Sequence, residues 1–443
     1  MPVELVRLDQ PLKVLMIAPT SFFADYGCHV RILEEVRALE ALGHRVTICT
    51  YHNGADVPGL DIRRSVDVPW RKRVVVGSSR HKLYLDGVLS LQVLRTALRL
   101  RPDLIHAHLH EGALIGGLLA RLIGCPLVFD YQGSLTEEML DHGFMRRNGR
   151  RESVLRRIEH AIERLPRRVV TSSENARERL LCAGFPASRL TTVPDGVDTG
   201  RFSPESVSEA DRADLRRRLG IPADAPVVTY LGLLAPYQGS DLLLDAAVRI
   251  HAAVPNAFFL VMGFPGNERY RLMAERLGLG GCSSFPGRIP YHEAHRYLAL
   301  GDVAVAPKMS LTEGNGKLYN YMAMGLPVVA FDAPANREIL GDLGVYARHG
   351  DTVDFAGRVV HLLKDPATSV ALGDGLRRRA ADRFTWERRI EDLLATYAAV
   401  IAPASGRTIT NPSRTSNLGT PRSETGPAAE QSTEPEARAP VSD

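Results

Sequence analysis

The sequence predicts an α/β protein built from two similar halves, each a doubly wound parallel sheet. Continuous apolar runs such as LKVLMIA (12–18) and VVTYLGLL (227–234) alternate with segments of helical apolar spacing. Uniformly apolar strands are typical of parallel sheets that are buried on both faces. The segment IPADAP (221–226) interrupts the alternation between the two series. We therefore expect two such domains that face a central cleft, and clefts between domains are favoured ligand sites.

Composition limits the classes of protein that need to be considered. The chain has 443 residues, 44% hydrophobic and 24% charged, which is ordinary for a globular protein of two or three domains. A net charge of +4 is too small to indicate a nucleic-acid partner. The five cysteines are scattered without a CxxC motif, which argues against a zinc or disulfide framework and for a reducing interior. The N-terminus lacks the apolar core of a signal peptide and no run approaches 18 apolar residues, so we expect a cytoplasmic protein.

The first half begins with a strand (12–18), a loop, a helix (30–42) and a second strand (44–51). The loop has no GxGxxG motif, so the dinucleotide-binding fingerprint is absent. Only Gly27 lies where the helix begins. It is a candidate phosphate or acceptor contact, although a glycine before a helix is equally explained by turn chemistry.

Three histidines follow in DLIHAHLHEGALIG (103–116), where a strand is expected to run into a helix. His106, His108 and His110 alternate, so they would share one face of the strand. A metal site is disfavoured because no further ligand with suitable spacing lies nearby in the sequence. We expect one histidine at the strand end to face the cleft. In the next strand and loop, PLVFDYQGS (126–134), Gln132 is a candidate on the same side.

A basic helical segment, RRNGRRESVLRRIEHAIERLPRR (146–168), carries an apolar stripe with arginines on its other faces. One interpretation is contact with an anionic membrane surface, which would place the protein peripherally at the inner membrane. The other interpretation, which the sequence favours, is a core-packed helix with a solvated cationic face. The segment 84–100 is a similar amphipathic helix.

These patterns divide the chain into an N-terminal Rossmann-like domain (1–204), a linker region (205–225), a second Rossmann-like domain (226–385) and a closing helix (386–401). Residues 404–443 are rich in Ser, Thr, Pro, Glu and Arg and have almost no large apolar side chains. This composition predicts a disordered tail.

The segment APKMSLTEGNGKLYNYMAMGLPVVAF (306–331) predicts a βαβ unit with a glycine-rich turn before its helix. Glycines allow close backbone approach, and free N–H groups at the start of a helix favour anions. Lys308 and Lys317 add positive charge, and Asn320 shares a helix face with Lys317. The turn could hold a diphosphate and sugar hydroxyls. The alternative is a polar loop with a solvated lysine.

Several motifs together resemble the family 4 glycosyltransferases, which are retaining enzymes of the GT-B fold. They are YGCHVRI, DLIHAHLHEG, VVTSS, VPDGVDTGRF, YLGLLAPYQGSDLLLDA and EGNGKLYNYMAMGLPVVAF, and the resemblance covers the chain from about residue 12 to residue 401. The resemblance implies transfer of a sugar from a nucleotide diphosphate sugar, UDP- or GDP-linked, to an acceptor with retention of anomeric configuration and without a metal or cofactor. The donor would lie mainly on the C-terminal half, and the acceptor would enter from the N-terminal half.

The resemblance also implies roles for single residues. His108 and Glu313 would be catalytic. His110, the fallback for His108, and Gln132 would lie on the acceptor side. Contacts to the donor diphosphate would come from Gly27, Gln238, Lys308, Gly314, Asn315, Gly316 and Lys317. Contacts to the nucleotide would come from Arg288, Leu318 and Asn320.

The sequence departs from the family pattern at three positions. Leu233 and Gln238 stand where the family usually has an arginine and a lysine that grip the diphosphate. Asn320 replaces the second of the family's paired glutamates and lies seven residues after Glu313. We hypothesise that Lys308 and Lys317 supply the missing charge, because a leaving diphosphate needs electrostatic stabilisation.

Two other classes stay open at this point. The chain could be a catalytically degenerate binding protein that kept the fold and lost the diphosphate grip. It could also be a GT-B enzyme of another reaction type, such as an epimerase or a phosphorylase. The acceptor is unidentified, and the basic helix only hints at a lipid-linked or cell-envelope glycan.

Overall fold

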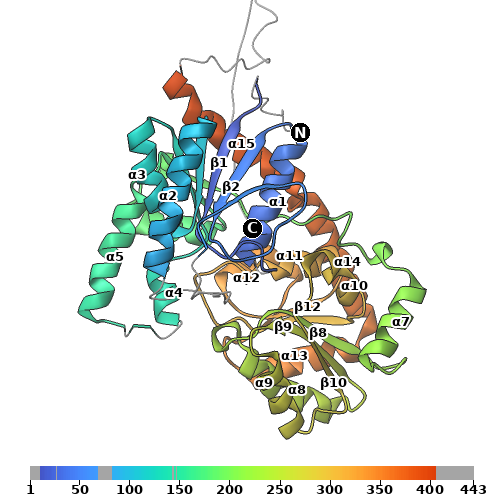
Figure 1. Ribbon diagram of the computed structural model, residues 1–443. Coiled ribbons are helices and arrows are strands. Elements are labelled where there is room, and N and C mark those ends of the chain that lie inside the picture. The colour runs from blue at the N-terminus through green and yellow to red at the C-terminus, as the bar shows by residue number, and fades with distance from the viewer. Residues whose placement is uncertain (1–9, 26, 68–81, 142–143, 146, 406–443) are drawn as a thin grey trace, which may run out of the picture. The chain divides into compact units, whose positions relative to one another are not determined.

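The computed structural model describes residues 10–25, 27–67, 82–141, 144–145 and 147–405. These residues form two all-parallel sheets, and helices cover both faces of each (Figure 1). The predicted α/β class with two parallel-sheet domains is therefore confirmed. The predicted tail lies outside the described residues except for its first two positions.

The first sheet has seven strands in the order β3-β2-β1-β4-β5-β6-β7. Its strands are β1 (Lys13–Ala18), β2 (Arg45–Thr50), β3 (Asp61–Arg64), β4 (Leu104–His108), β5 (Leu127–Tyr131), β6 (Arg168–Thr171) and β7 (Leu190–Thr192). The helices between them are α1 (Gly27–Ala41), α2 (Lys82–Leu100), α3 (Leu109–Ile123), α4 (Leu135–Asp141), α5 (Arg150–Glu163) and α6 (Glu174–Cys182). The strand order reverses between β1 and β4, which is where open α/β sheets bind ligands at their carboxyl edge.

Alternation along β1 shows why this strand is apolar throughout. Val14 and Met16 pack toward α1, whereas Leu15 and Ile17 pack toward α2 and α3. Successive side chains of a strand point to opposite faces, so a sheet covered on both sides needs apolar residues at every position. Figure 1 shows this arrangement, with α2 and α3 on one side of the sheet and α1 with α15 on the other.

The second sheet has six strands in the order β10-β9-β8-β11-β12-β13, with its reversal between β8 and β11. Its strands are β8 (Val227–Leu233), β9 (Phe258–Phe264), β10 (Ser283–Gly287), β11 (Val303–Ala306), β12 (Val328–Phe331) and β13 (Val345–Ala347). Its helices are α8 (Ser240–Ala253), α9 (Asn267–Arg276), α10 (Ala294–Leu298), α11 (Lys317–Ala323), α12 (Pro334–Leu340), α13 (Thr352–Lys364) and α14 (Pro366–Arg383). Helix α14 was not predicted from the sequence as a separate helix.

The chain passes between the two sheets twice. The first passage follows β7 and contains α7 (Glu209–Leu219), whose Leu215 is buried in the core. The predicted linker region therefore holds a packed helix. The second passage leads from α14 into α15 (Trp386–Ser405), which packs against α1, β5 and β6 of the first sheet. The two passages touch each other, because the Val197 N–H donates to the Phe384 carbonyl at 2.7 Å and Val197 pairs with Thr385.

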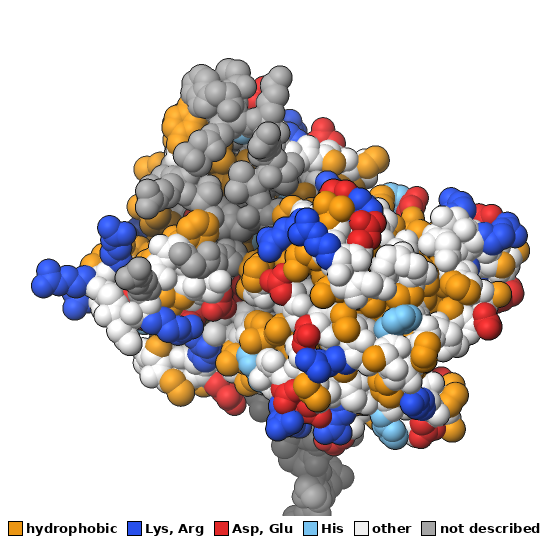
Figure 2. All heavy atoms as spheres, turned by 90° about the horizontal axis from the view of Figure 1, so that it is seen from below, with side chains coloured by type: hydrophobic (Ala, Val, Ile, Leu, Met, Phe, Trp, Pro, Cys, Tyr) orange, Lys and Arg blue, Asp and Glu red, His pale blue; other side chains and the backbone are white. Residues whose placement is uncertain are grey.

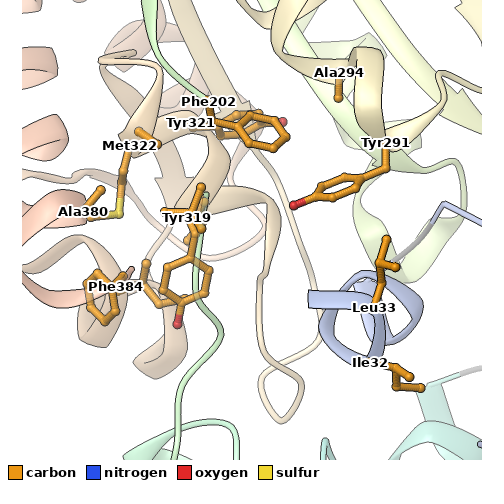
Figure 3. Close-up of a cluster of buried hydrophobic side chains, with 14 of the residues drawn as sticks. Ile32, Leu33, Phe202, Tyr291, Ala294, Tyr319, Tyr321, Met322, Ala380 and Phe384 are labelled. Atoms are coloured by element: carbon orange, nitrogen blue, oxygen red, sulfur yellow. The ribbon is translucent and has the colours of Figure 1, made fainter. Parts of the chain in front are cut away.

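One apolar cluster joins helices from both halves (Figure 3). Tyr319 of α11 meets Phe384 edge to face with ring centroids 5.0 Å apart, and Phe202 lies 5.5 Å from Tyr291. Leu33 of α1 belongs to the same cluster. Burial of such aromatic side chains stabilises each by a few kcal/mol, so the cluster holds the two sheets in contact.

The described surface is mixed in charge on the face seen in Figure 2, where Lys and Arg side chains alternate with Asp, Glu and apolar groups. Such interspersed charge does not form the basic stripe that nucleic-acid binding requires. Within the described residues, no helix combines the length and apolar character that crossing a membrane demands.

Candidate active site

A cavity lies where the carboxyl edges of the two sheets meet. Each sheet contributes residues near its own reversal point, the position where open α/β sheets bind ligands. The first half contributes Asp25, Gly27, Arg31 and Asp195, and the second half contributes Gly232, Leu233, Gln238, Gly263, Phe264, Lys308, Gly314, Asn315, Gly316, Lys317 and Asn320. Eight of the predicted site residues thus line one cavity, namely Gly27, Gln238, Lys308, Gly314, Asn315, Gly316, Lys317 and Asn320.

Lys317 begins α11 and points its ammonium at the end of β8. Its Nζ donates to the Tyr230 hydroxyl at 3.3 Å and to Gln238 Oε1 at 3.2 Å, and it lies 4.4 Å from the centre of the Tyr230 ring. Burial and, as a smaller cause, the neighbouring Lys308 lower the pKa of Lys317 to about 7, while Glu313 opposes the shift. An ammonium with only neutral hydrogen-bond partners at these distances is suited to an incoming anion.

Lys308 follows β11 and approaches the same cavity. Its Nζ forms an ion pair with Glu313 Oε2 at 2.8 Å and donates to the Gly314 carbonyl at 2.6 Å. Both contacts hold the glycine-rich turn against the strand end. Glu313 in turn lies across from the first half, because a Cβ added at Gly133 would meet Glu313 Cγ at 3.6 Å. The predicted catalytic carboxylate is therefore ion-paired at the contact between the halves.

Two glycines lie behind Lys317. At Gly263 an added Cβ would lie 2.3 Å from the Gly232 carbonyl oxygen, so no ordinary side chain fits there without moving the backbone of the cavity wall. At Gly232 an added Cβ would lie 2.8 Å from Lys317 Nζ, the end of a flexible side chain, and the φ of +156° is the stronger reason for glycine.

A hydrogen bond between two buried asparagine side chains holds the glycine-rich turn in place. Asn315 Nδ2 donates to Asn336 Oδ1 at 2.9 Å, and Asn336 Nδ2 donates to the Phe331 carbonyl at 2.8 Å. Leu318, predicted to contact the nucleotide, is instead fully buried in the apolar core. The correction follows from the helical period, since Leu318 lies one residue after Lys317 and so faces away from the cavity.

Arg288, also a predicted nucleotide contact, forms hydrogen bonds with a residue of the first half. Its Nε and Nη2 donate to Asp25 Oδ2 at 2.8 and 2.6 Å, and Asp25 Oδ1 accepts from the Tyr291 N–H at 2.8 Å. Asp25 lines the cavity next to Gly27, the first residue of α1. Arg288 itself is not among the described residues that line the cavity, whereas Gly27 brings the positive end of α1 to it.

His108, predicted to be catalytic, is fully buried in a network of polar groups behind the cavity wall. Its Nδ1 lies 2.9 Å from Asp130 Oδ2, and its ring stacks on His106 with centroids 4.5 Å apart. Its Nε2 has no hydrogen-bond partner among the described residues. Gln132 Nε2 also donates to Asp130 Oδ2, at 2.7 Å. The described residues that line the cavity include neither histidine, so the structure places His108 beside the site rather than on its surface.

Arg31 and Asp130 are the centre of this network, and the sequence analysis missed Arg31. The guanidinium donates to both Asp130 oxygens, with Nε at 3.1 and 3.0 Å, and its Nη1 donates to Asp195 at 2.7 Å. Burial alone would raise the pKa of Asp130, but Arg31 and then His108 hold it well below its usual range. Burial raises the pKa of the adjacent Glu35 to about 8. The available signal was the spacing of Arg31 and Glu35, which lie four residues apart and so share a helix face.

Two expectations about the histidines were wrong. His110 does not share a strand face with His106 and His108, because β4 ends at His108 and His110 lies in the first turn of α3. Its ring packs edge to face on Phe129 at 5.2 Å, away from the cavity, so its acceptor-side role finds no support in the geometry. The metal site was disfavoured because no further ligand lies nearby in the sequence, but folding brings carboxylates to these histidines from distant segments.

Family models match the two halves separately. The Glycosyl transferase 4-like domain matches residues 26–196, and the Glycosyl transferases group 1 domain matches residues 211–379. The first match begins after β1 and covers the other six strands of the first sheet, and the second covers all strands of the second sheet.

Curated relatives extend over most of the chain. A D-inositol 3-phosphate glycosyltransferase of Geodermatophilus obscurus is 28% identical over 411 residues, covering 86% of this chain and 87% of that protein. A GDP-mannose-dependent alpha-(1-6)-phosphatidylinositol monomannoside mannosyltransferase of Mycolicibacterium smegmatis is 33% identical over 226 residues, covering 49% of this chain and 58% of that protein.

Solved structures share the fold at low sequence identity. A sucrose-phosphate synthase from Thermosynechococcus elongatus superimposes with a TM-score of 0.75 at 21% identity, covering 88% of this chain and all of that one. Anabaena HepE in complex with UDP and glucose superimposes with a TM-score of 0.71 at 18% identity and the same coverage. The chain therefore belongs to the family 4 glycosyltransferases of the GT-B fold.

Proposed function

We propose that the enzyme transfers a sugar from a UDP- or GDP-linked donor to its acceptor with retention of configuration and without a catalytic metal. The observation that carries the proposal is the position of Lys308 and Lys317 beside the glycine-rich turn, in a cavity lined by both sheets. Two ammonium groups and the start of α1 provide positive potential where a diphosphate would lie. This charge substitutes for the cations that the family places at the positions of Leu233 and Gln238.

A donor screen tests this proposal. Purified protein is melted in the presence of a panel of UDP and GDP sugars, and a donor at a hundred times its dissociation constant stabilises the fold by about 2.7 kcal/mol. The donor found is then used for transfer assays, with the anomeric configuration of the product read by NMR. We expect retention, and we expect turnover that added Mg²⁺ or Mn²⁺ does not raise. An inverted product would refute the stereochemical part.

The acceptor panel follows from the named relatives. One of them acts on D-inositol 3-phosphate and another on a phosphatidylinositol monomannoside, so both compounds belong in the panel. We propose a lipid-linked or cell-envelope glycan as the acceptor class. Transfer to the phosphorylated inositol alone would instead favour a water-soluble acceptor.

The degenerate alternative makes a different prediction. If the protein no longer binds the donor diphosphate, no donor of the panel shifts the melting temperature. In that case the substitutions Leu233→Arg and Gln238→Lys should restore donor binding. If Lys308 and Lys317 supply the grip, the wild-type protein binds and these substitutions change affinity little. An epimerase or phosphorylase would form product from the donor without any glycan acceptor.

We propose peripheral membrane contact through the outer surface of α2, α3 and α5. These helices pack side by side and expose Leu98, Leu118, Leu122, Val154 and Ile158, with exposed arginines between them on α5. Apolar side chains flanked by arginine suit an anionic bilayer surface.

Sedimentation with vesicles tests this contact. We expect binding to vesicles that contain phosphatidylglycerol and weaker binding to neutral vesicles. The double substitution of Leu118 and Leu122 by Ser should reduce binding. The matched control Val353→Ser, an equally exposed residue of α13, should not. Equal binding by both variants would refute the assignment.

A further inference from the structure

A second polar cluster lies between α3 and α5, outside the donor cavity. His110 of α3 points its Nε2 at two glutamates that lie one turn apart on α5. The distances from Nε2 to Glu159 Oε1 and to Glu163 Oε1 are both 3.6 Å. All three side chains are buried, with 3 to 4% of their surface exposed.

We propose that His110, Glu159 and Glu163 form a binding site for one divalent transition-metal ion of the Zn²⁺ type, which joins α3 to α5. Imidazole nitrogen and carboxylate oxygen are both common ligands of this ion. The three ligand atoms all lie within 4.8 Å of one another. The site would be structural, since it is separate from the cavity that holds the two lysines.

The distances fit coordination better than hydrogen bonding. An N–H···O hydrogen bond has its heavy atoms at about 2.7–3.2 Å, so a separation of 3.6 Å is too long. Tetrahedral Zn²⁺ with bonds of about 2.0–2.1 Å places its ligand atoms about 3.3–3.4 Å apart. His110 Nε2 and Glu159 Oε1 accordingly have no hydrogen-bond partner within the described part of the chain, although both are buried.

The second oxygen of each glutamate is already bound elsewhere. Glu159 Oε2 accepts from the Thr136 N–H at 3.3 Å and from the Thr136 hydroxyl. Glu163 Oε2 lies 2.8 Å from His160 Nδ1. These partners fix both carboxylates so that each Oε1 faces His110. Orientation of ligands by such outer hydrogen bonds is typical of metal sites.

The charge of the cluster also favours a bound divalent ion over protonation of His110. Two buried carboxylates need compensation, since an unpaired charge in the interior is costly. Protonation of His110 supplies one positive charge, whereas a divalent ion supplies two. A water in the remaining coordination position would complete the usual four ligands.

Zinc titration of the full-length, tag-free chain tests the site. After treatment with EDTA and buffer exchange, calorimetry should show one saturable Zn²⁺ site per chain, and Zn²⁺ should raise the melting temperature. Glu163→Gln and His110→Gln should each weaken binding at least tenfold and abolish the thermal shift. Glu152→Gln, a buried glutamate of the same helix paired with Arg156, is the matched control and should bind as the wild type does.

Two further measurements keep the test decisive. His108→Gln should retain the Zn²⁺ site, because His108 belongs to the separate cluster around Arg31. If His110→Gln does not fold, the visible spectrum of Co²⁺ bound to the wild type and to Glu163→Gln gives the same information. The proposal is overturned if no saturable site exists, if Glu163→Gln binds like the wild type, or if His108→Gln abolishes binding.

Discussion

The affinity of the enzyme for a nucleoside diphosphate should depend on pH through Lys317. Burial lowers the pKa of this ammonium to about 7 in the ligand-free protein, so it is protonated below that pH and increasingly neutral above it. A diphosphate beside the group favours the charged form, and binding above pH 7 therefore takes up a proton. Affinity should be constant below about pH 7 and fall about tenfold per pH unit above it, until the pKa of the complex is reached.

Calorimetry with UDP and with GDP measures this effect. Titrations at about pH 6, 7, 8 and 9 give the affinity, and two buffers of different ionisation enthalpy give the number of protons taken up. Lys317→Met removes the group that titrates. Because a hydrogen bond to a charged group contributes about 1.5–3 kcal/mol, the variant should bind roughly 10- to 150-fold more weakly at low pH.

At high pH the difference in affinity between the wild type and Lys317→Met should become smaller, because the wild-type lysine is then neutral as well. Comparing the two proteins at each pH cancels the titration of the ligand's own phosphate. Lys317→Arg keeps the charge at every pH and should bind with a flatter pH profile. The reasoning is refuted if wild-type affinity is constant from about pH 6 to 9, or if the ratio of wild type to Lys317→Met does not change with pH.

Three further substitutions test the structure around the cavity. Gly263→Ala should lower the free energy of unfolding by about 1–3 kcal/mol, because its Cβ would press on the Gly232 carbonyl, and denaturant unfolding measures this. Asp130→Asn leaves the Arg31 guanidinium incompletely neutralised and should cost about 3–5 kcal/mol by the same assay; an unchanged midpoint would contradict the assigned ion pair. Tyr397→Phe removes the hydroxyl that lies 2.6 Å from the buried His106 and should cost about 1–3 kcal/mol, with native circular dichroism as the control.

Much of the fold followed from the sequence because apolar periodicity determines parallel sheets directly. The strand predicted at 12–18 corresponds to β1 within one residue, and the helix predicted after the glycine-rich turn of 306–331 is α11. The glycine-rich turn and both lysines lie in the cavity for the same local reason, since a βα turn ends at the carboxyl edge of its sheet.

The remaining parts depend on contacts between distant segments, which periodicity does not contain. Whether a histidine at a strand end faces solvent or the interior depends on what covers it, and His108 is covered by Asp130 and Arg31. His110 meets Glu159 and Glu163 only because α5 packs across α3. The helix α15 returns to the first sheet for a similar reason, with Tyr397 reaching His106.

The paired passages between the sheets have a mechanical consequence. Two covalent connections that ran far apart would resist rotation of one half against the other about most axes. Here Val197 is hydrogen-bonded to Phe384, so both connections cross at one place. That place is a pivot, and a rotation about it changes the spacing of the halves most at the edge farthest from it. The ion pair between Arg288 and Asp25 also joins the halves, so a rotation that separated them at that point would have to break it.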